Sequence, residues 1–129
     1  MNVLVIGGDG FIGSHFVDQA TRLNHNVTVF DRFRHISSRN LEHQRGRIKF
    51  ESGDFANRED LSKVLDNQDI VYHFISATNP KESWNDPFIE IDQNLINSVR
   101  LFELAVQKKV KKIVFLSSGG TIYGAQNKA

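Results

Sequence analysis

The segment Val-Leu-Val-Ile-Gly-Gly-Asp-Gly-Phe-Ile-Gly-Ser-His, residues 3–15, joins a short apolar run to three spaced glycines. Residues 3–6 are too few for a helix and rich in β-branched side chains, which predicts a buried strand. Gly7 permits a tight turn, Gly10 lets backbone approach a pyrophosphate, and Gly13 lets the next helix pack closely. The N-terminus of that helix would offer free N–H groups to phosphates. This pattern predicts a dinucleotide site, provided that the chain continues as a βαβ unit.

The composition is that of a globular protein without unusual chemistry. The chain has 129 residues, of which 40% are hydrophobic and 24% charged, so we expect one domain over residues 1–129. The net charge of +1 is spread along the chain and favours neither nucleic acid nor a membrane surface as a partner. Cysteine is absent, which excludes disulfides and thiolate chemistry, and no His, Asp and Glu spacing predicts a metal site. The N-terminus lacks a signal-peptide pattern, so we expect a cytoplasmic protein.

Short apolar runs alternate with helical patterns along the rest of the chain. Further strands are predicted at 27–30, 48–51, 70–74 and 113–116, and helices at about 10–23, at 61–65 after a cap at Asn57 or Asp60, and at 88–106. The polar segment 32–47 predicts a loop with a turn of helix near 39–43. This alternation predicts an α/β fold, a doubly wound parallel sheet of the Rossmann type.

The longest predicted helix carries an apolar stripe at spacings of three and four, which we interpret as core packing rather than as a cofactor site. Its members are Phe88, Ile91, Leu95, Val99, Phe102 and Val106. His73 lies within a predicted strand, and we interpret it as a buried core histidine rather than a catalytic base.

Asp31 ends the second predicted strand, about 20 residues after the glycines, where dinucleotide-binding folds place an acid against the adenosine ribose. The alternative is an aspartate that starts a surface turn. Arginines in the segment 32–47 complicate the choice of cofactor, because an arginine near this position can accommodate a 2′-phosphate. The carboxylate of Asp31 would repel that phosphate, so we predict NAD rather than NADP.

Polar or glycine-containing segments follow each predicted strand. Because parallel strands end at the same edge of a sheet, these segments are expected to line one ligand site. They are the segments 7–13, 76–78 and 117–121 together with Asp31 and Asp54.

With these residues together, the chain resembles the N-terminal part of the extended short-chain dehydrogenases/reductases, in particular the NAD-dependent nucleotide-sugar epimerases and dehydratases. Six motifs carry this resemblance, in order and at matching spacing. They are Gly-Gly-Asp-Gly-Phe-Ile-Gly-Ser at 7–14, Asp31 with the later Asn40-Leu41, Gly-Asp-Phe at 53–55, Val-Tyr-His-Phe at 71–74, Asn94-Leu95, and Ser-Ser-Gly-Gly-Thr-Ile-Tyr-Gly at 117–124.

The resemblance implies roles for particular residues. It implies NAD binding by Gly7, Gly10, Phe11, Ile12, Gly13, Asp31, Asp54, Phe55, Ile75, Ser76, Thr78 and Asn94. The family also uses a Ser or Thr hydroxyl in catalysis at a position that is Gly119 here, so Ser118 or Thr121 would have to supply it.

The chain also departs from the family pattern. The family's general acid/base is the tyrosine of a Tyr-x-x-x-Lys pair, but Tyr72 and Tyr123 have Ser76 and Asn127 four residues on. The resemblance therefore implies a fold truncated after about five strands, without the C-terminal part that binds the nucleotide-sugar substrate, and a chain that is inactive alone. The alternative is a non-catalytic dinucleotide-binding or self-associating module. An uncovered sheet edge favours a homo-oligomer in either case.

Overall fold

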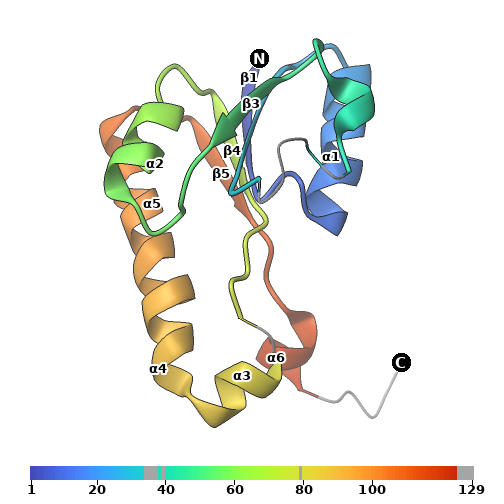
Figure 1. Cartoon of the computed structure of the whole chain (residues 1–129). Coiled ribbons are helices and arrows are strands. Elements are labelled where there is room, and N and C mark those ends of the chain that lie inside the picture. Colours follow the sequence, from blue (N-terminus) through green and yellow to red (C-terminus); the bar gives the residue numbers. More distant parts are fainter. Residues whose placement is uncertain (34–37, 39, 79, 125–129) are drawn as a thin grey trace.

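The computed structural model describes residues 1–33, 38, 40–78 and 80–124, with the backbone alone for residues 80, 82, 83 and 121. Five parallel strands form one sheet in the order β3-β2-β1-β4-β5 (Figure 1). The predicted doubly wound Rossmann-type sheet is confirmed. The strands are β1 (Asn2–Ile6), β2 (Asn26–Asp31), β3 (Lys49–Ser52), β4 (Ile70–His73) and β5 (Lys112–Phe115).

Strand β1 lies at the centre of the sheet because its residues are apolar on both faces. Val3 pairs with Val27 of β2 on one side and with Ile70 of β4 on the other. Val3 and Val5 pack toward one face, whereas Leu4 and Ile6 pack toward the other. The chain reverses its direction of travel across the sheet between β3 and β4, so the carboxyl ends of β1 and β4 form the switch point where such sheets bind ligands.

Helices cover both faces of this sheet (Figure 1). Helix α1 (Phe11–Arg22) places Val17 and Ala20 on Val3 and Val5. Helices α2 (Arg58–Val64) and α5 (Asn97–Gln107) pack against the opposite face. Shorter elements are the 3₁₀ helix η1 (Glu42–Gln44) and the helices α3 (Pro80–Asn85) and α6 (Gly119–Tyr123). None of the helices in the described ranges is long and apolar enough to cross a bilayer.

The start of α2 resolves one alternative left by the sequence. The Asn57 side chain accepts hydrogen bonds from the N–H groups of Glu59 and Asp60, at 2.9 and 3.3 Å, and is the N-cap. Asp60 instead accepts from the N–H of Asp54 at 3.0 Å, which fixes the turn after β3. The predicted helical turn near 39–43 is found slightly later, as η1, and residue 39 lies outside the described residues.

The long helix forms as predicted, but the predicted burial of its apolar stripe is wrong. It runs as α4 (Pro87–Glu90), a π-helical turn η2 (Ile91–Ile96), and α5. Phe88 and Val106 are 73% and 78% exposed, and the rest of the stripe is also exposed. The core contacts come from the other side of α5, namely Asn97, Ser98, Leu101, Leu104 and Ala105.

Two physical reasons explain this error. Helix α5 is apolar on two faces, so periodicity alone does not identify the inner one. In addition, buried residues on the inner face include the polar side chains of Asn97 and Ser98, which hydropathy assigns to solvent. We refer below to the exposed stripe Phe88, Ile91, Leu95, Val99, Phe102 and Val106 as the outer stripe.

Candidate functional site

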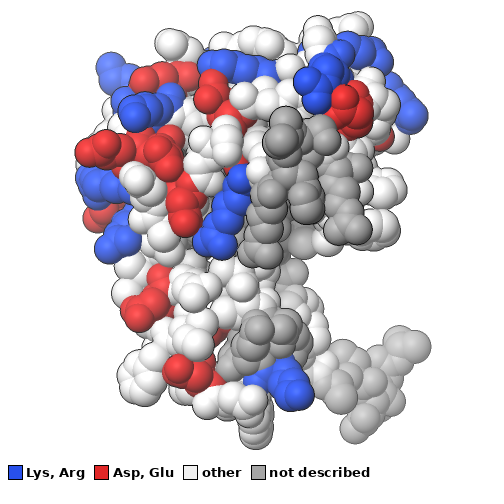
Figure 2. Space-filling view, viewed as in Figure 1, with Lys and Arg blue, Asp and Glu red and all other residues white. Residues whose placement is uncertain are grey.

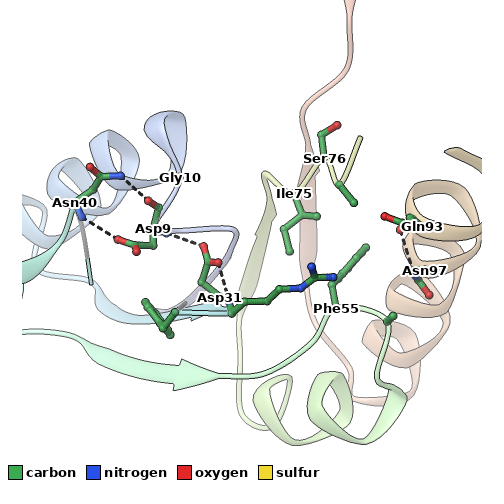
Figure 3. Close-up of a pocket in the computed structure, with 13 residues that line it drawn as sticks. Asp9, Gly10, Asp31, Asn40, Phe55, Ile75, Ser76, Gln93 and Asn97 are labelled. Carbon is green, nitrogen blue, oxygen red and sulfur yellow. Dashed lines mark hydrogen bonds between the residues drawn. The ribbon is translucent and has the colours of Figure 1, made fainter. Parts of the chain in front are cut away.

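A cavity of about 420 Å³ opens at the carboxyl ends of the strands, within the size range of small-molecule sites (Figure 3). It is lined by the loops after β1, β2, β3 and β4 and by the π-helical turn. The lining residues are Asp9, Gly10, Asp31, Arg32, Phe33, Asn40, Phe55, Ala56, Ile75, Ser76, Ala77, Gln93 and Asn97.

The glycine loop closes one side of this cavity. Gly7 has a φ of +79°, and its N–H donates to the Phe30 carbonyl at 2.8 Å, which turns the chain sharply after β1. Gly10 is the N-cap of α1 and makes no side-chain cap. A Cβ at Gly10 would lie 3.2 Å from the Gly7 carbonyl oxygen, so the missing side chain leaves the backbone accessible from the cavity. The first N–H groups of α1 thus form an anion-binding surface.

Asp31 faces the same end of the cavity as the glycine loop. One carboxylate oxygen accepts the Asp9 N–H at 3.0 Å, and the other accepts the Arg32 N–H at 2.8 Å. Each oxygen of a carboxylate has about two lone-pair sites, so both retain capacity for ligand hydroxyls. These bonds fix the direction of the carboxylate before any ligand arrives.

Arg32 bridges the loops after β2 and β3. Its guanidinium donates to the Asp54 carboxylate at 3.3 Å, with both side chains half exposed. The same Asp54 oxygen accepts the Ala56 N–H at 2.9 Å and shapes the turn that carries Phe55. Phe55 is 4% exposed and contributes an apolar wall. The cavity therefore combines an apolar ring, a carboxylate and a paired arginine.

The loop after β4 is attached to the π-helical turn. The Asn94 side chain accepts the Ala77 N–H at 2.8 Å and donates to the Thr78 hydroxyl at 2.9 Å. Thr78 also donates to the Glu90 carboxylate. These bonds attach the segment of Ile75, Ser76 and Ala77, which lines the cavity, to the π-helical turn, and Asn94 itself is not part of the lining.

Asn97 enters the cavity from the end of this turn. Its side-chain amide donates to the carbonyls of Asp92 and Gln93 at 3.2 and 3.0 Å. These two carbonyls belong to the π-helical turn, which is wider than an α-helical turn. Gln93 and Asn97 thereby form the end of the cavity opposite Asp31 (Figure 3).

His73 lies behind Phe55 and not in the cavity. It is 2% exposed, its Nε2 lies 2.9 Å from the Ser98 hydroxyl, and its ring centroid lies 5.0 Å from that of Phe55. Its Nδ1 has no hydrogen-bond partner among the described residues. Burial lowers the pKa of His73 from 6.5 to about 4, because the charged ring would be poorly solvated there. His73 is a core residue, as predicted, although only one of its two ring nitrogens has a hydrogen-bond partner among the described residues.

This pKa predicts a pH-dependent stability. Between pH 6.5 and about 4 the unfolded chain carries a proton on His73 that the folded chain does not. Stability therefore rises with pH across this window, and the free energy of unfolding is expected to fall by about 3 kcal/mol on acidification through it. Urea unfolding of the parent and of His73→Asn at several pH values isolates this contribution. Identical pH profiles for the two proteins would contradict it.

The structure brings five of the predicted site residues together in the cavity: Gly10, Asp31, Phe55, Ile75 and Ser76. The other expected cofactor residues lie outside the lining, in the loops after the strands, at the start of α1 or in the π-helical turn: Gly7, Phe11, Ile12, Gly13, Asp54, Thr78 and Asn94. Ser118 precedes α6 and Thr121 lies within it, and neither belongs to the lining.

The sequence reasoning missed several lining residues. Asp9 and Ala77 have no individual role in the sequence-based prediction, but they lie in the segments 7–13 and 76–78 that are expected to line the site. Ala56 was missed, although it directly follows the Gly-Asp-Phe motif, so its position alone could have indicated it. Gln93 and Asn97 had no such signal, because the sequence pattern of a π-helical turn resembles that of an ordinary helix.

The parallel sheet, the glycine loop at a helix N-terminus and the acid after β2 define a dinucleotide-binding α/β protein. Residues 3–129 match the model of the NAD-dependent epimerase/dehydratase family, and the chain belongs to that family.

Individual relatives agree with this assignment. The bifunctional UDP-glucose 4-epimerase and UDP-xylose 4-epimerase 1 of Pisum sativum is 34% identical over 98% of this chain and 39% of its own length. UDP-glucuronic acid decarboxylase 1 of Danio rerio is 32% identical over 95% of this chain and 28% of its length. The UDP-glucose 4-epimerase of Stenotrophomonas maltophila, solved with bound NAD and formylated UDP-arabinopyranose, superposes with a TM-score of 0.87 at 30% identity, over 99% of this chain and 40% of that one. The chain thus spans about two fifths or less of these relatives.

Proposed function

We propose that the cavity binds NAD and that the chain is the NAD-binding portion of a UDP-glucose 4-epimerase-like nucleotide-sugar epimerase. The observation that carries this proposal is the convergence of the helix N-terminus at Gly10 and the Asp31 carboxylate on one cavity. The first suits a pyrophosphate and the second suits the hydroxyls of an adenosine ribose. Phe55 and Ile75 supply the apolar surface that an adenine ring requires.

Titration calorimetry with NAD tests this proposal. The 129-residue chain is expected to bind NAD, and Asp31→Ala is expected to weaken binding about tenfold or more through loss of hydrogen bonds to a charged acceptor. Asp66→Ala is the matched control. Asp66 pairs with Lys108 at 2.6 Å and takes no part in lining the cavity, so its loss should leave the affinity unchanged. A folded parent chain that binds no NAD would contradict the proposal.

This chain alone is expected to bind the cofactor without catalysing the reaction. In an epimerase, NAD takes up a hydride from a sugar carbon and returns it to the other face. The residues of this chain would bind and orient that cofactor, and Ser118 or Thr121 would offer a hydroxyl to the sugar. The 129-residue sequence contains two tyrosines, and neither has a lysine four residues on, so the chain alone should not turn over a UDP-sugar. The relatives include a decarboxylase, so the reaction of a longer protein could differ while the cofactor role stays the same.

We also propose that the chain self-associates through the outer stripe. Its residues follow spacings of three and four along one helix, the pattern that packs against a second helix. Phe102 contacts Phe115 of the edge strand β5, with ring centroids 6.3 Å apart, so the apolar surface continues onto the sheet. Figure 2 shows few charged side chains over the lower part of the molecule, where α4 extends beyond the sheet. A second copy presents the same stripe and can pair with it symmetrically.

A further inference from the structure

Asp9 connects the glycine loop to the segment that follows β2. Its carboxylate accepts the Asn40 N–H at 3.0 Å and the hydroxyl of Ser38. In return, the Asn40 side-chain amide donates to the Asp9 carbonyl at 2.6 Å (Figure 3). These residues are about thirty positions apart in the chain, so the contacts are tertiary and define one wall of the cavity.

This wall is anchored in the core. The Leu41 N–H donates to the Ser38 hydroxyl at 2.8 Å, and the Leu41 side chain is fully buried beside Val17 and Val29. The contacts run from the buried leucine through Ser38 to the carboxylate of Asp9. The Asp9 carboxylate is therefore held in place beside Ser38 and Asn40.

The same contacts place two carboxylates at one end of the cavity. The Asp9 N–H donates to the Asp31 carboxylate, so the two residues are direct neighbours there (Figure 3). Arg32, the described cation that lines this end, is paired with Asp54, which lies outside the lining. A ribose hydroxyl can donate to a carboxylate, whereas a phosphate dianion on the same ribose would be repelled by both.

We infer that Asp9 is a specificity-determining residue that excludes 2′-phosphorylated dinucleotides from the cavity. This inference rests on the proposed NAD-binding function and extends it from Asp31, whose position in the fold already predicts a ribose contact, to a residue at the variable position of the glycine fingerprint. Asp9 acts in two ways. Its hydrogen bonds hold Ser38 and Asn40 in place, and its charge adds to that of Asp31.

Two substitutions separate these contributions. Asp9→Asn removes the charge and keeps a side-chain oxygen that can accept the Asn40 N–H. Asn40→Ala removes the bond to the Asp9 carbonyl and changes no charge. Asp66→Asn makes the same change in net charge as Asp9→Asn but lies outside the cavity lining.

The test compares NAD and NADP binding to the 129-residue chain and these variants by calorimetry at low ionic strength. Asp9→Asn is expected to shift the NADP-to-NAD affinity ratio about tenfold toward NADP, the size expected for removing one nearby charge. Asn40→Ala should weaken both ligands in parallel, and Asp66→Asn should leave the ratio as in the parent.

An unchanged ratio in Asp9→Asn, with NAD still bound by the parent, would overturn this inference alone. An equal shift of the ratio in Asp66→Asn would overturn it as well, because the effect would then come from net charge. A parent chain that binds neither dinucleotide would overturn the proposed function and this inference with it.

Discussion

Gly13→Ala is expected to destabilise the fold by about 3 kcal/mol, at the upper end of the usual cost of overpacking. A Cβ at Gly13 would lie 2.3 Å from the Gly7 carbonyl oxygen and 2.7 Å from the Gly8 Cα. Both are backbone atoms, so no side-chain rotation relieves the contact. Helix α1 must move away from β1, and its N-terminus leaves the position that forms the anion-binding surface. NAD affinity is therefore expected to fall together with stability.

Gly120→Ala is the matched control for this substitution. Gly120 lies in α6, and a Cβ there would have no atom within 4 Å. Alanine is also favoured over glycine within a helix, so this variant should be as stable as the parent or slightly more stable. Urea unfolding followed by circular dichroism is the suitable measurement, because the single tryptophan, Trp84, is 88% exposed and reports poorly on unfolding. Equal midpoints for Gly13→Ala and Gly120→Ala would contradict the prediction.

The two faces of α5 are expected to respond in opposite ways to substitution. Leu101 is fully buried against the sheet, so Leu101→Ala should cost about 3 kcal/mol of stability. Val106 is 78% exposed on the outer stripe, so Val106→Lys should change stability by less than about 0.5 kcal/mol. The lysine should nevertheless weaken self-association, because it places a charge within an apolar helix contact.

Urea unfolding and light scattering over a range of chain concentrations measure these two effects separately. The parent chain is expected to gain mass with concentration, and Val106→Lys is expected to remain monomeric to higher concentrations. A parent chain that stays monomeric throughout would contradict the proposed self-association. A large loss of stability in Val106→Lys would instead show that this face is part of the core.

The sheet could be predicted from the sequence because all five strands are short runs rich in apolar residues and the three inner ones, β1, β2 and β4, carry the buried positions. Asp31 and the loop at Ile75 and Ser76 could be placed in the site because parallel strands end at one edge. The end of the cavity at Asn97 could not be predicted, because it depends on a π-helical turn that hydropathy does not reveal. The buried face of α5 could not be predicted either. Ser98 on that face is polar, yet it is buried in contact with His73.

The central position of β1 has a consequence for the order of folding during synthesis. Its partner in β2 begins at Asn26, but its partner in β4 begins at Ile70. During synthesis β1 therefore keeps one unpaired edge until the residues of β4, Ile70–His73, have been made. Such non-local pairing slows folding and leaves an apolar strand exposed to other nascent chains. The central position that brings the glycine loop to the cavity thus also delays the pairing of β1 with β4.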